Sequence, residues 1–291
     1  MKQVTIIGLG LIGASLGLAL KQLKNPPRVI GHDIQYDAAT KANKIKAVDK
    51  VDRYLPDAVA GSDLVLVATP VGAVPEVFKS IADTLPDGCI VSDTGSTKRE
   101  ILREAEKILP STVGFVGGHP MTGKLTGGVA EPKASLFQNA VYCLVPSVSA
   151  PPAAVDTMAR LVQQIGAYPY FTDSAEHDGL VAGISHLPYL LSVALTRALA
   201  DQPGWREMAI LAAGGFDSAT RLSGHDPKMY ADILATNRDN VARHIDALVE
   251  ELEILKAKLL EGDGNILGDL EKAQEQRIAW EEQKRKSASG S

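Results

Sequence analysis

The sequence GGHPMTG at residues 117–123 places a histidine at the expected end of a buried strand. Imidazole titrates near neutral pH, so His119 suits the removal of a hydroxyl proton, which dehydrogenases that act on alcohols require. Pro120 favours an extended backbone at His119. The alternative is a structural or capping histidine. His119 is therefore the first candidate for a catalytic base.

Two further polar clusters follow apolar runs: ATP at 68–70 and SDTGSTK at 92–98. Ligands of open α/β sheets bind at the carboxyl ends of the strands, so both clusters are candidates for the same site. Ser96 is a second catalytic candidate, and its alternative role is the N-cap of a helix over 96–108. Lys98 is expected to be a solvated residue of that helix. The candidates for cofactor contacts in these clusters are Thr69, Pro70 and Thr94.

A histidine and an arginine in the C-terminal half are candidates for substrate binding. His186 lies in an apolar helical stretch two residues before Pro188, which lacks an N–H and frees a carbonyl one turn back. With His177 and Asp178, it marks a polar seam that is expected to face the N-terminal domain. A buried structural histidine is the alternative.

Arg221 stands in the glycine-flanked segment GGFDSATRLSG, which is expected to connect two helices. Its guanidinium can bind a substrate carboxylate through two parallel hydrogen bonds. An ion pair with Asp217 or Asp226 is the alternative.

The N-terminal residues VTIIGLGLIG form an apolar run that breaks into Gly8-x-Gly10-x-x-Gly13, and Asp33 follows the next apolar run. This is the dinucleotide-binding fingerprint: a tight turn, a close approach to the pyrophosphate, and a helix packed on the sheet. Leu11 and Ile12 begin the helix, whose free N–H groups can bind phosphate. A signal peptide or membrane anchor is the alternative, but the apolar stretch is short and lacks a cleavage site.

Asp33 predicts NAD in preference to NADP, because a carboxylate accepts hydrogen bonds from ribose hydroxyls and repels a 2′-phosphate. Arg28, the nearest arginine in the sequence, stands at the other end of the strand.

Strands alternate with helices up to residue 173, which predicts a mainly parallel sheet and an α/β Rossmann-like domain over 1–173. Strands are expected at 3–8, 28–33, 63–68, 88–93, 113–117, 140–145 and 168–173. Helices are expected at 11–24, 37–46, 73–84, 96–108 and 153–165.

After residue 173 only helical patterns appear, at 174–199, 204–214, 226–235 and 237–261. These predict an all-α domain over 174–286. The last of them carries an apolar stripe typical of packing against another long helix, within or between subunits, formed by Val241, Ile245, Leu248, Leu252, Leu255 and Leu259. The charged stretch 269–286 is expected to be a fraying surface helix, and 287–291 a disordered tail.

The composition is that of an ordinary globular protein: 291 residues, 45% hydrophobic, 22% charged, with a net charge of −5. It gives no sign of nucleic-acid or membrane partners. Cys89 and Cys143 lie in apolar runs without metal-ligand spacing, which favours reduced core thiols, a cytoplasmic protein and no metal site.

The motifs GLGLIGASL, DTGSTK, GGHPMTG, SHLP and GGFDSATR occur in this order over residues 1–260 and resemble the prephenate/arogenate (cyclohexadienyl) dehydrogenase family of tyrosine biosynthesis. The resemblance implies an NAD(P)-dependent dehydrogenase that acts on a CH-CH group with decarboxylation, and a homodimer formed through the helical domain. It implies that His119 accepts the ring hydroxyl proton and that Ser96 helps to hold that hydroxyl. It places His186 near the substrate side chain and Arg221 on a substrate carboxylate. Thr122, in GGHPMTG, is added to the substrate contacts.

Asp217 departs from the family pattern, since prephenate-using relatives often carry a lysine there. An acid tolerates the ammonium group of arogenate, so arogenate or dual use is the main alternative to prephenate. A β-hydroxyacid-type dehydrogenase is less favoured, because such enzymes use a lysine in the helical domain and residues 174–227 contain none. A non-enzymatic NAD-sensing module is the last alternative.

Overall fold

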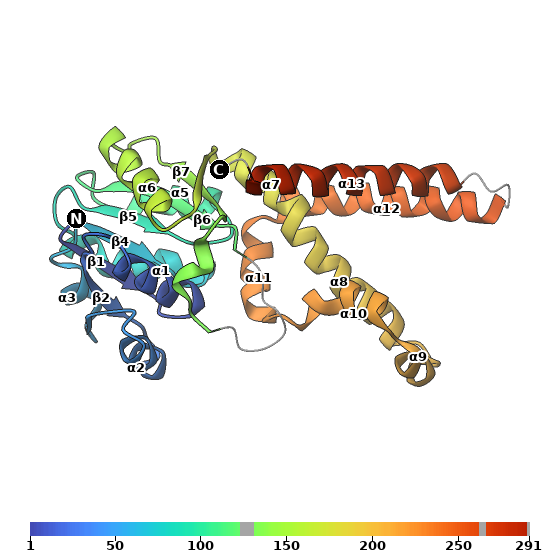
Figure 1. The fold of residues 1–291 in the computed structure, drawn as a ribbon, viewed down its shortest axis with the longest axis horizontal. Helices are drawn as coiled ribbons and strands as arrows, with labels where there is room; N and C mark the ends of the chain where they lie inside the picture. The colour runs from blue at the N-terminus through green and yellow to red at the C-terminus, as the bar shows by residue number, and fades with distance from the viewer. Residues whose placement is uncertain (123–130, 262–265, 290–291) are drawn as a thin grey trace. The chain divides into compact units, whose positions relative to one another are not determined.

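The computed structural model describes residues 1–122, 131–261 and 266–289. Contacts between residues divide the chain into two compact units, Met1–Arg238 and Asp239–Ser291. The first contains an α/β part followed by helices, and the second is helical (Figure 1). Residues 123–130 lie outside the described part, and with them Gly123, the last residue of the motif GGHPMTG.

The first unit is built on a sheet of eight strands in the order β3-β2-β1-β4-β5-β6-β7-β8. All neighbouring strands are parallel except β6 and β7, which are antiparallel. The predicted Rossmann-like fold with a mainly parallel sheet is confirmed. The strands are β1 (Gln3–Ile7), β2 (Arg28–His32), β3 (Lys50–Val51), β4 (Leu64–Val67), β5 (Ile90–Asp93), β6 (Gly114–Pro120), β7 (Val141–Pro146) and β8 (Tyr168–Phe171).

Two apolar cores cover the two faces of the sheet, because successive strand residues point to opposite faces. Along β4, Leu64 and Leu66 belong to one core, and Val65 and Val67 to the other. Helices α1, α2 and α6 pack on the first core, and α3, α4 and α5 on the second. Their bounds are α1 (Leu11–Lys21), α2 (Tyr36–Lys44), α3 (Leu55–Val59), α4 (Val74–Ile81), α5 (Arg99–Ile108) and α6 (Pro152–Gln164), with short 3₁₀ turns η1 (Val71–Ala73), η2 (Ala82–Thr84) and η3 (Ala134–Phe137).

The helices that follow the sheet begin with a continuous rod made of α7, a π-helical turn η4 and α8. The π-helical turn ends at His186, just before Pro188, whose missing N–H prevents regular α-helical hydrogen bonding there. The bounds in this part are α7 (Ser174–Val181), η4 (Ala182–His186), α8 (Leu187–Ala200), α9 (Trp205–Leu211), α10 (Gly214–Thr220), η5 (Arg221–Gly224) and α11 (Pro227–Thr236).

The second unit is formed by α12 (Arg238–Glu261) and α13 (Ile266–Ser289), which are joined by an ion pair between Lys258 and Asp269 at 2.5 Å. Helix α13 continues through Ser289, and residues 290–291 lie outside the described part. The disordered tail over 287–291 stays a prediction. The apolar stripe predicted on α12 is solvent-exposed in part, with Leu252 at 52% and Leu259 at 65%. Its packing against another long helix stays a prediction.

Three short or glycine-rich elements differ from the sequence prediction. Strand β3 and helix α3 were not expected, because two and five residues are too few to show a periodic pattern. The helix expected over 204–214 ends at Leu211, and α10 begins at Gly214 inside the segment expected to be a connection. Helix propensity disfavours two consecutive glycines, so this helix gives a weak signal in sequence.

The rod Ser174–Ala200 is long and apolar enough to cross a membrane by length and composition alone. However, His177, Asp178 and His186 on this rod are buried within the first unit. Such polar contacts are typical of a helix that packs on protein rather than on lipid.

Candidate functional site

The glycine loop after β1 has the geometry that the fingerprint predicts. Gly8 has φ of +90°, a conformation that side-chain-bearing residues rarely adopt, and its N–H donates to the His32 carbonyl at 2.9 Å. A Cβ on Gly13 would lie 1.8 Å from the Gly8 carbonyl oxygen, so only glycine fits there. These two positions fix the turn from β1 into α1.

The space beyond this turn fits a dinucleotide. Among the described residues, a Cβ on Gly10 would meet no atom within 4 Å, and no side chain caps α1, whose first residues are Leu11 and Ile12. Free N–H groups at a helix N-terminus bind phosphate. The buried Thr69 hydroxyl, next to Pro70 after β4, has no hydrogen-bond partner among the described residues. The loop therefore presents open backbone and an orphaned hydroxyl to a ligand.

Thr94 lies at the same edge of the sheet, because its N–H donates to the Val67 carbonyl at the end of β4 at 3.0 Å. The carboxyl ends of β1, β4 and β5 thus bring together the loops in which Gly10, Thr69 and Thr94 were predicted to contact a cofactor. Their cofactor contacts stay predictions.

Asp33 is held at the end of β2 by the backbone of the glycine loop. Its Oδ2 accepts the Leu9 N–H and its Oδ1 accepts the Gln35 N–H, each at 2.7 Å. Each carboxylate oxygen keeps acceptor capacity for a ribose hydroxyl.

Sequence reasoning missed Arg53 near this position. The Asp52 N–H donates to the Gly31 carbonyl at 2.9 Å, which sets the residues after β3 beside the end of β2. The guanidinium of Arg53 lies 4.5 Å from the ring centroid of Tyr36, at the start of α2. The two-residue strand β3 gives no sequence signal that brings Arg53 here.

His119, the predicted base, lies in β6 and is linked to the helical part of the unit. Its Nδ1 is 3.0 Å from His177 Nε2, and His177 Nδ1 is 2.8 Å from Asp178 Oδ1. The two imidazoles meet edge to face, with ring centroids 5.2 Å apart. The seam predicted at 177–178 therefore does face the sheet and ends on His119.

Burial holds the pKa of His119 well below its usual range, and positive charge on His177, Lys98 or His186 would lower it further. His119 is accordingly neutral at physiological pH. A neutral imidazole has one nitrogen that can accept a proton, which is the state that a general base needs.

Asp178 caps helix α5 from another part of the chain. Its Oδ1 accepts the Lys98 N–H at 2.7 Å, and its Oδ2 accepts the Arg99 N–H at 3.0 Å. The N-cap role that was the alternative for Ser96 is therefore excluded: the helix begins at Arg99, and a carboxylate 80 residues away in sequence accepts its first N–H groups. The catalytic role of Ser96 stays a prediction. Ser96 lies in the loop between β5 and α5.

Lys98 is buried rather than solvated, which corrects the sequence prediction. Its side chain is 0% exposed and its Nζ pairs with Asp93, which is equally buried. Asp93 also accepts the N–H groups of Gly95 at 2.7 Å and Gly118 at 3.1 Å. Burial lowers the pKa of the Lys98 amine, and Asp93 offsets part of this effect. Through these contacts Asp93 connects Lys98, in the loop after β5, with Gly118 in β6, next to His119.

His186 is also buried, and Asn237 lies beside it. Asn237 Nδ2 is 2.7 Å from the Asp178 carbonyl oxygen and 3.3 Å from His186 Nδ1. An amide nitrogen only donates, so His186 Nδ1 accepts and Nε2 carries the proton. This buried Nε2 has no partner among the described residues. His186 thus offers one unused N–H donor.

Burial lowers the pKa of His186 to about 4, while Asp178 raises it and His177 lowers it. The unfolded chain, with an ordinary pKa near 6.5, binds more protons between these values, so stability falls as pH decreases through this window. We expect His186 alone to remove about 3 kcal/mol of the free energy of unfolding between pH ~7 and ~4.

Urea unfolding of the wild type and of His186→Gln at these two pH values tests this expectation. The variant should lose less of its free energy of unfolding on acidification than the wild type. An equal loss in both proteins would show that His186 takes up its proton equally in the folded and unfolded states.

Arg221, which is predicted to bind a substrate carboxylate, is the first residue of η5 and is exposed. Its charge lowers the pKa of Tyr230, although burial raises that pKa overall. The Tyr230 ring stacks on Tyr189, three residues after His186, with centroids 3.5 Å apart. Thr122 Oγ1 is buried without a partner among the described residues.

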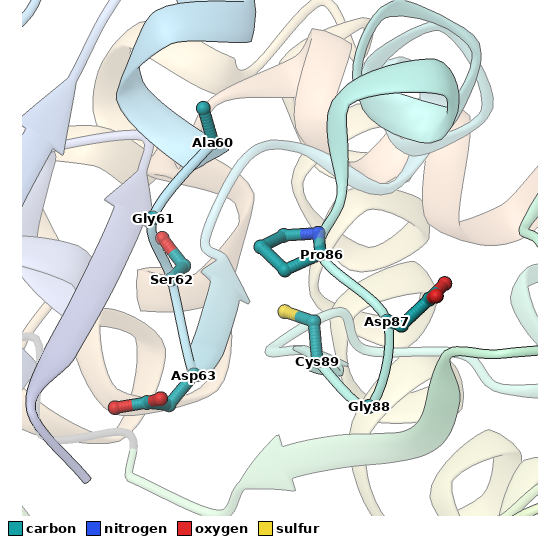
Figure 2. A pocket seen from close by; sticks show the side chains of 8 residues that line it. All are labelled: Ala60, Gly61, Ser62, Asp63, Pro86, Asp87, Gly88 and Cys89. Atoms are coloured by element: carbon teal, nitrogen blue, oxygen red, sulfur yellow. The ribbon is translucent and has the colours of Figure 1, made fainter.

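A small hollow at the amino ends of β4 and β5 is not a candidate for the chemistry. It lies between two loops, Ala60–Asp63 and Pro86–Cys89 (Figure 2). Ligands of such sheets bind at the opposite, carboxyl ends. Burial raises the pKa of the Cys89 thiol to about 12, so it is not a nucleophile at neutral pH. The prediction of reduced core thiols is confirmed, since Cys89 and Cys143 are both free and buried.

Comparison with known proteins gives consistent matches over both halves of the chain. The family model "Prephenate dehydrogenase, nucleotide-binding domain" matches residues 16–170, and "Prephenate dehydrogenase, dimerization domain" matches residues 173–272. The prephenate dehydrogenase of Bacillus subtilis is 32% identical over 91% of this chain and 72% of its own length. The cyclohexadienyl dehydrogenase of Zymomonas mobilis is 29% identical over 96% of both chains.

A solved structure resembles the whole chain. The prephenate dehydrogenase of Aquifex aeolicus, in complex with hydroxyphenyl propionate and NAD+, superposes with a TM-score of 0.89 at 26% identity. The match covers 96% of this chain and 98% of the Aquifex chain.

Proposed function

Because this chain belongs to the prephenate dehydrogenase family, we propose that it oxidises and decarboxylates prephenate to 4-hydroxyphenylpyruvate with NAD, using His119 as the base. The observation that carries this proposal is the position of His119. It lies on β6, held by His177, with its pKa lowered so that it is neutral when substrate binds. Alcohol oxidation needs such a proton acceptor.

In the proposed reaction, His119 Nε2 takes the proton of the ring hydroxyl as the carbinol C–H bond breaks. Bound NAD supplies the acceptor for the hydride that leaves this carbon. The ring carboxylate then departs as CO₂, and its bonding electrons complete the aromatic ring. The phenolate that results takes the proton back from His119 or from water, which gives the phenol. Aromatisation provides the driving force, so the protein needs chiefly to orient the groups and accept one proton.

The other candidate residues bind and orient the substrate. His186 donates its Nε2–H to an oxygen of the substrate side chain, and Arg221 binds a substrate carboxylate. Ser96, in the loop between β5 and α5, helps to hold the hydroxyl. Thr122 contributes its unpaired hydroxyl. We assign residues 1–173 to the dinucleotide-binding domain and 174–286 to the substrate and dimerisation domain of a cytoplasmic enzyme.

Arogenate is the second candidate substrate, because Asp217 stands on α10, close in sequence to Arg221. A carboxylate there tolerates the ammonium group of arogenate better than the pyruvyl group of prephenate. The ratio of kcat/KM for the two substrates decides between them. We expect the ratio to favour prephenate, and a value that favours arogenate by tenfold or more would replace it as the substrate.

The cofactor preference rests on Asp33, and Arg53 gives a way to reverse it. In Asp33→Ser the repulsion of a 2′-phosphate is lost, and the nearby guanidinium of Arg53 can pair with that phosphate. We expect the ratio of kcat/KM for NADP to that for NAD to rise about tenfold or more.

The control for this experiment is the double variant Asp33→Ser/Arg53→Ala, in which the gain for NADP should largely disappear. A wild-type enzyme that already prefers NADP would contradict the role given to Asp33.

We propose that the protein is a homodimer whose interface includes the rod α7-η4-α8. Leu180, Ile184 and Leu191 on this rod are 48%, 70% and 45% exposed, and the matched family model is that of a dimerization domain. Several exposed large apolar side chains on one helical segment are typical of an interface. Glutamate at Ile184 and Leu191 would bury two unpaired charges in it.

We therefore expect Ile184→Glu/Leu191→Glu to raise the dimer dissociation constant on the order of 10²-fold. Sedimentation equilibrium measures this constant. Lys79→Glu, an exposed change on α4, is the control and should remain dimeric. A dimer of unchanged affinity in the double variant would place the interface elsewhere.

A further inference from the structure

The hydrogen bonds of His119, His177 and Asp178 form a chain in which the direction of each donor can be assigned. Asp178 Oδ1 also accepts the Lys98 N–H and Oδ2 the Arg99 N–H, so the carboxylate serves as an acceptor on both oxygens. The 2.8 Å contact from His177 therefore has Nδ1–H as its donor. A neutral His177 then has its lone pair on Nε2.

This assignment determines the next contact. His177 Nε2 lies 3.0 Å from His119 Nδ1, and two lone pairs cannot form a hydrogen bond. His119 must accordingly carry its proton on Nδ1, which leaves the lone pair on Nε2. Isolated imidazole has no such constraint, since either nitrogen can carry the proton.

We propose that His177 and Asp178 are positioning residues that fix His119 in the Nδ1–H tautomer and so direct its basic nitrogen, Nε2, to the substrate. This inference rests on the proposed role of His119 as the base. After His119 accepts a proton at Nε2, its Nδ1–H still donates to His177, and the Asp178 carboxylate beyond it stabilises the positive charge. Neither residue needs to contact the substrate.

Asp178 also links the base, His119, to the contacts between the helical segment and the α/β part of the unit. Asp178 caps α5, which follows the loop that carries Ser96, and its carbonyl accepts from Asn237. His186 Nδ1, in contrast, accepts from Asn237, so His186 has the opposite tautomer. The site thus holds one imidazole with a free lone pair and one with a free N–H, fixed by adjacent hydrogen bonds.

The test is the tautomer of His119, read from the ¹⁵N chemical shifts of histidine-labelled protein without substrate. The His119 signals are assigned by their absence in His119→Asn. We expect Nδ1–H in the wild type and in His177→Gln, whose amide oxygen can accept the same hydrogen bond. In His177→Leu, which offers no acceptor, the proton should move in large part to Nε2, and kcat should fall about 10²-fold.

The tautomer of His186 is the internal control, because its partner Asn237 is unchanged in these variants. Either of two results overturns the inference: a wild-type His119 protonated at Nε2, or His177→Leu with an unchanged tautomer and unchanged kcat. If His177→Leu does not fold, the wild-type and His177→Gln spectra still decide. Absence of turnover in every variant would contradict the proposed function, whereas the tautomer is measured without turnover.

Discussion

Replacing His119 with Asn is expected to lower kcat by about 10²–10⁴-fold, because the enzyme then lacks an acceptor for the hydroxyl proton. Asparagine has a similar size and can still donate to His177, so the packing at the end of β6 should survive. Steady-state rates of NADH formation measure kcat, and fluorescence titration measures the affinity for NADH. We expect the affinity to change little.

The control is Lys79→Gln, an exposed exchange in the last turn of α4, which should leave kcat unchanged. If His119→Asn kept more than a tenth of the wild-type kcat, His119 would be a structural histidine, as the sequence alone allowed.

The second large effect is expected at Lys98, whose buried amine pairs with the buried Asp93. Lys98→Met removes the positive charge and leaves the carboxylate of Asp93 inside the protein without its ionic partner. Breaking a buried pair in this way costs about 3–5 kcal/mol. Urea unfolding of the variant should show this loss in the free energy of unfolding.

The double variant Asp93→Asn/Lys98→Met separates loss of the pair from loss of packing. Because both charges are absent, we expect it to be more stable than the sum of the two single losses predicts, by about 1–3 kcal/mol. Two results would show that the pair does not stabilise the contact between β6 and the loop that follows β5. One is that the losses in free energy of unfolding are additive, and the other is that Lys98→Met costs less than about 1 kcal/mol.

Features determined by short stretches of sequence could be predicted. The glycine loop, Asp33 and the alternation of strands and helices depend on local conformation and periodicity, and the structure has them as expected. The position of His119 near the end of a buried strand followed from the same pattern. The strand is longer than the expected 113–117, since β6 continues through Pro120 and includes the histidine.

Contacts between distant parts of the chain could not be predicted in the same way. Nothing local to α5 shows that Asp178, 80 residues further along the chain, rather than Ser96 accepts its first N–H groups. Lys98 and Asp93 are only five residues apart, but their complete burial depends on the strands and helices that pack around them. Arg53 reaches Tyr36 only because β3 pairs with β2. These residues tune the charges and tautomers of the site, and their roles depend on tertiary packing.

The most direct test of this account is NADH formation by the purified wild-type protein with NAD and either prephenate or arogenate, with release of CO₂ measured in parallel. We expect NADH and CO₂ in equal amounts with prephenate, at a rate that His119→Asn nearly abolishes. Absence of both products with either substrate would contradict it.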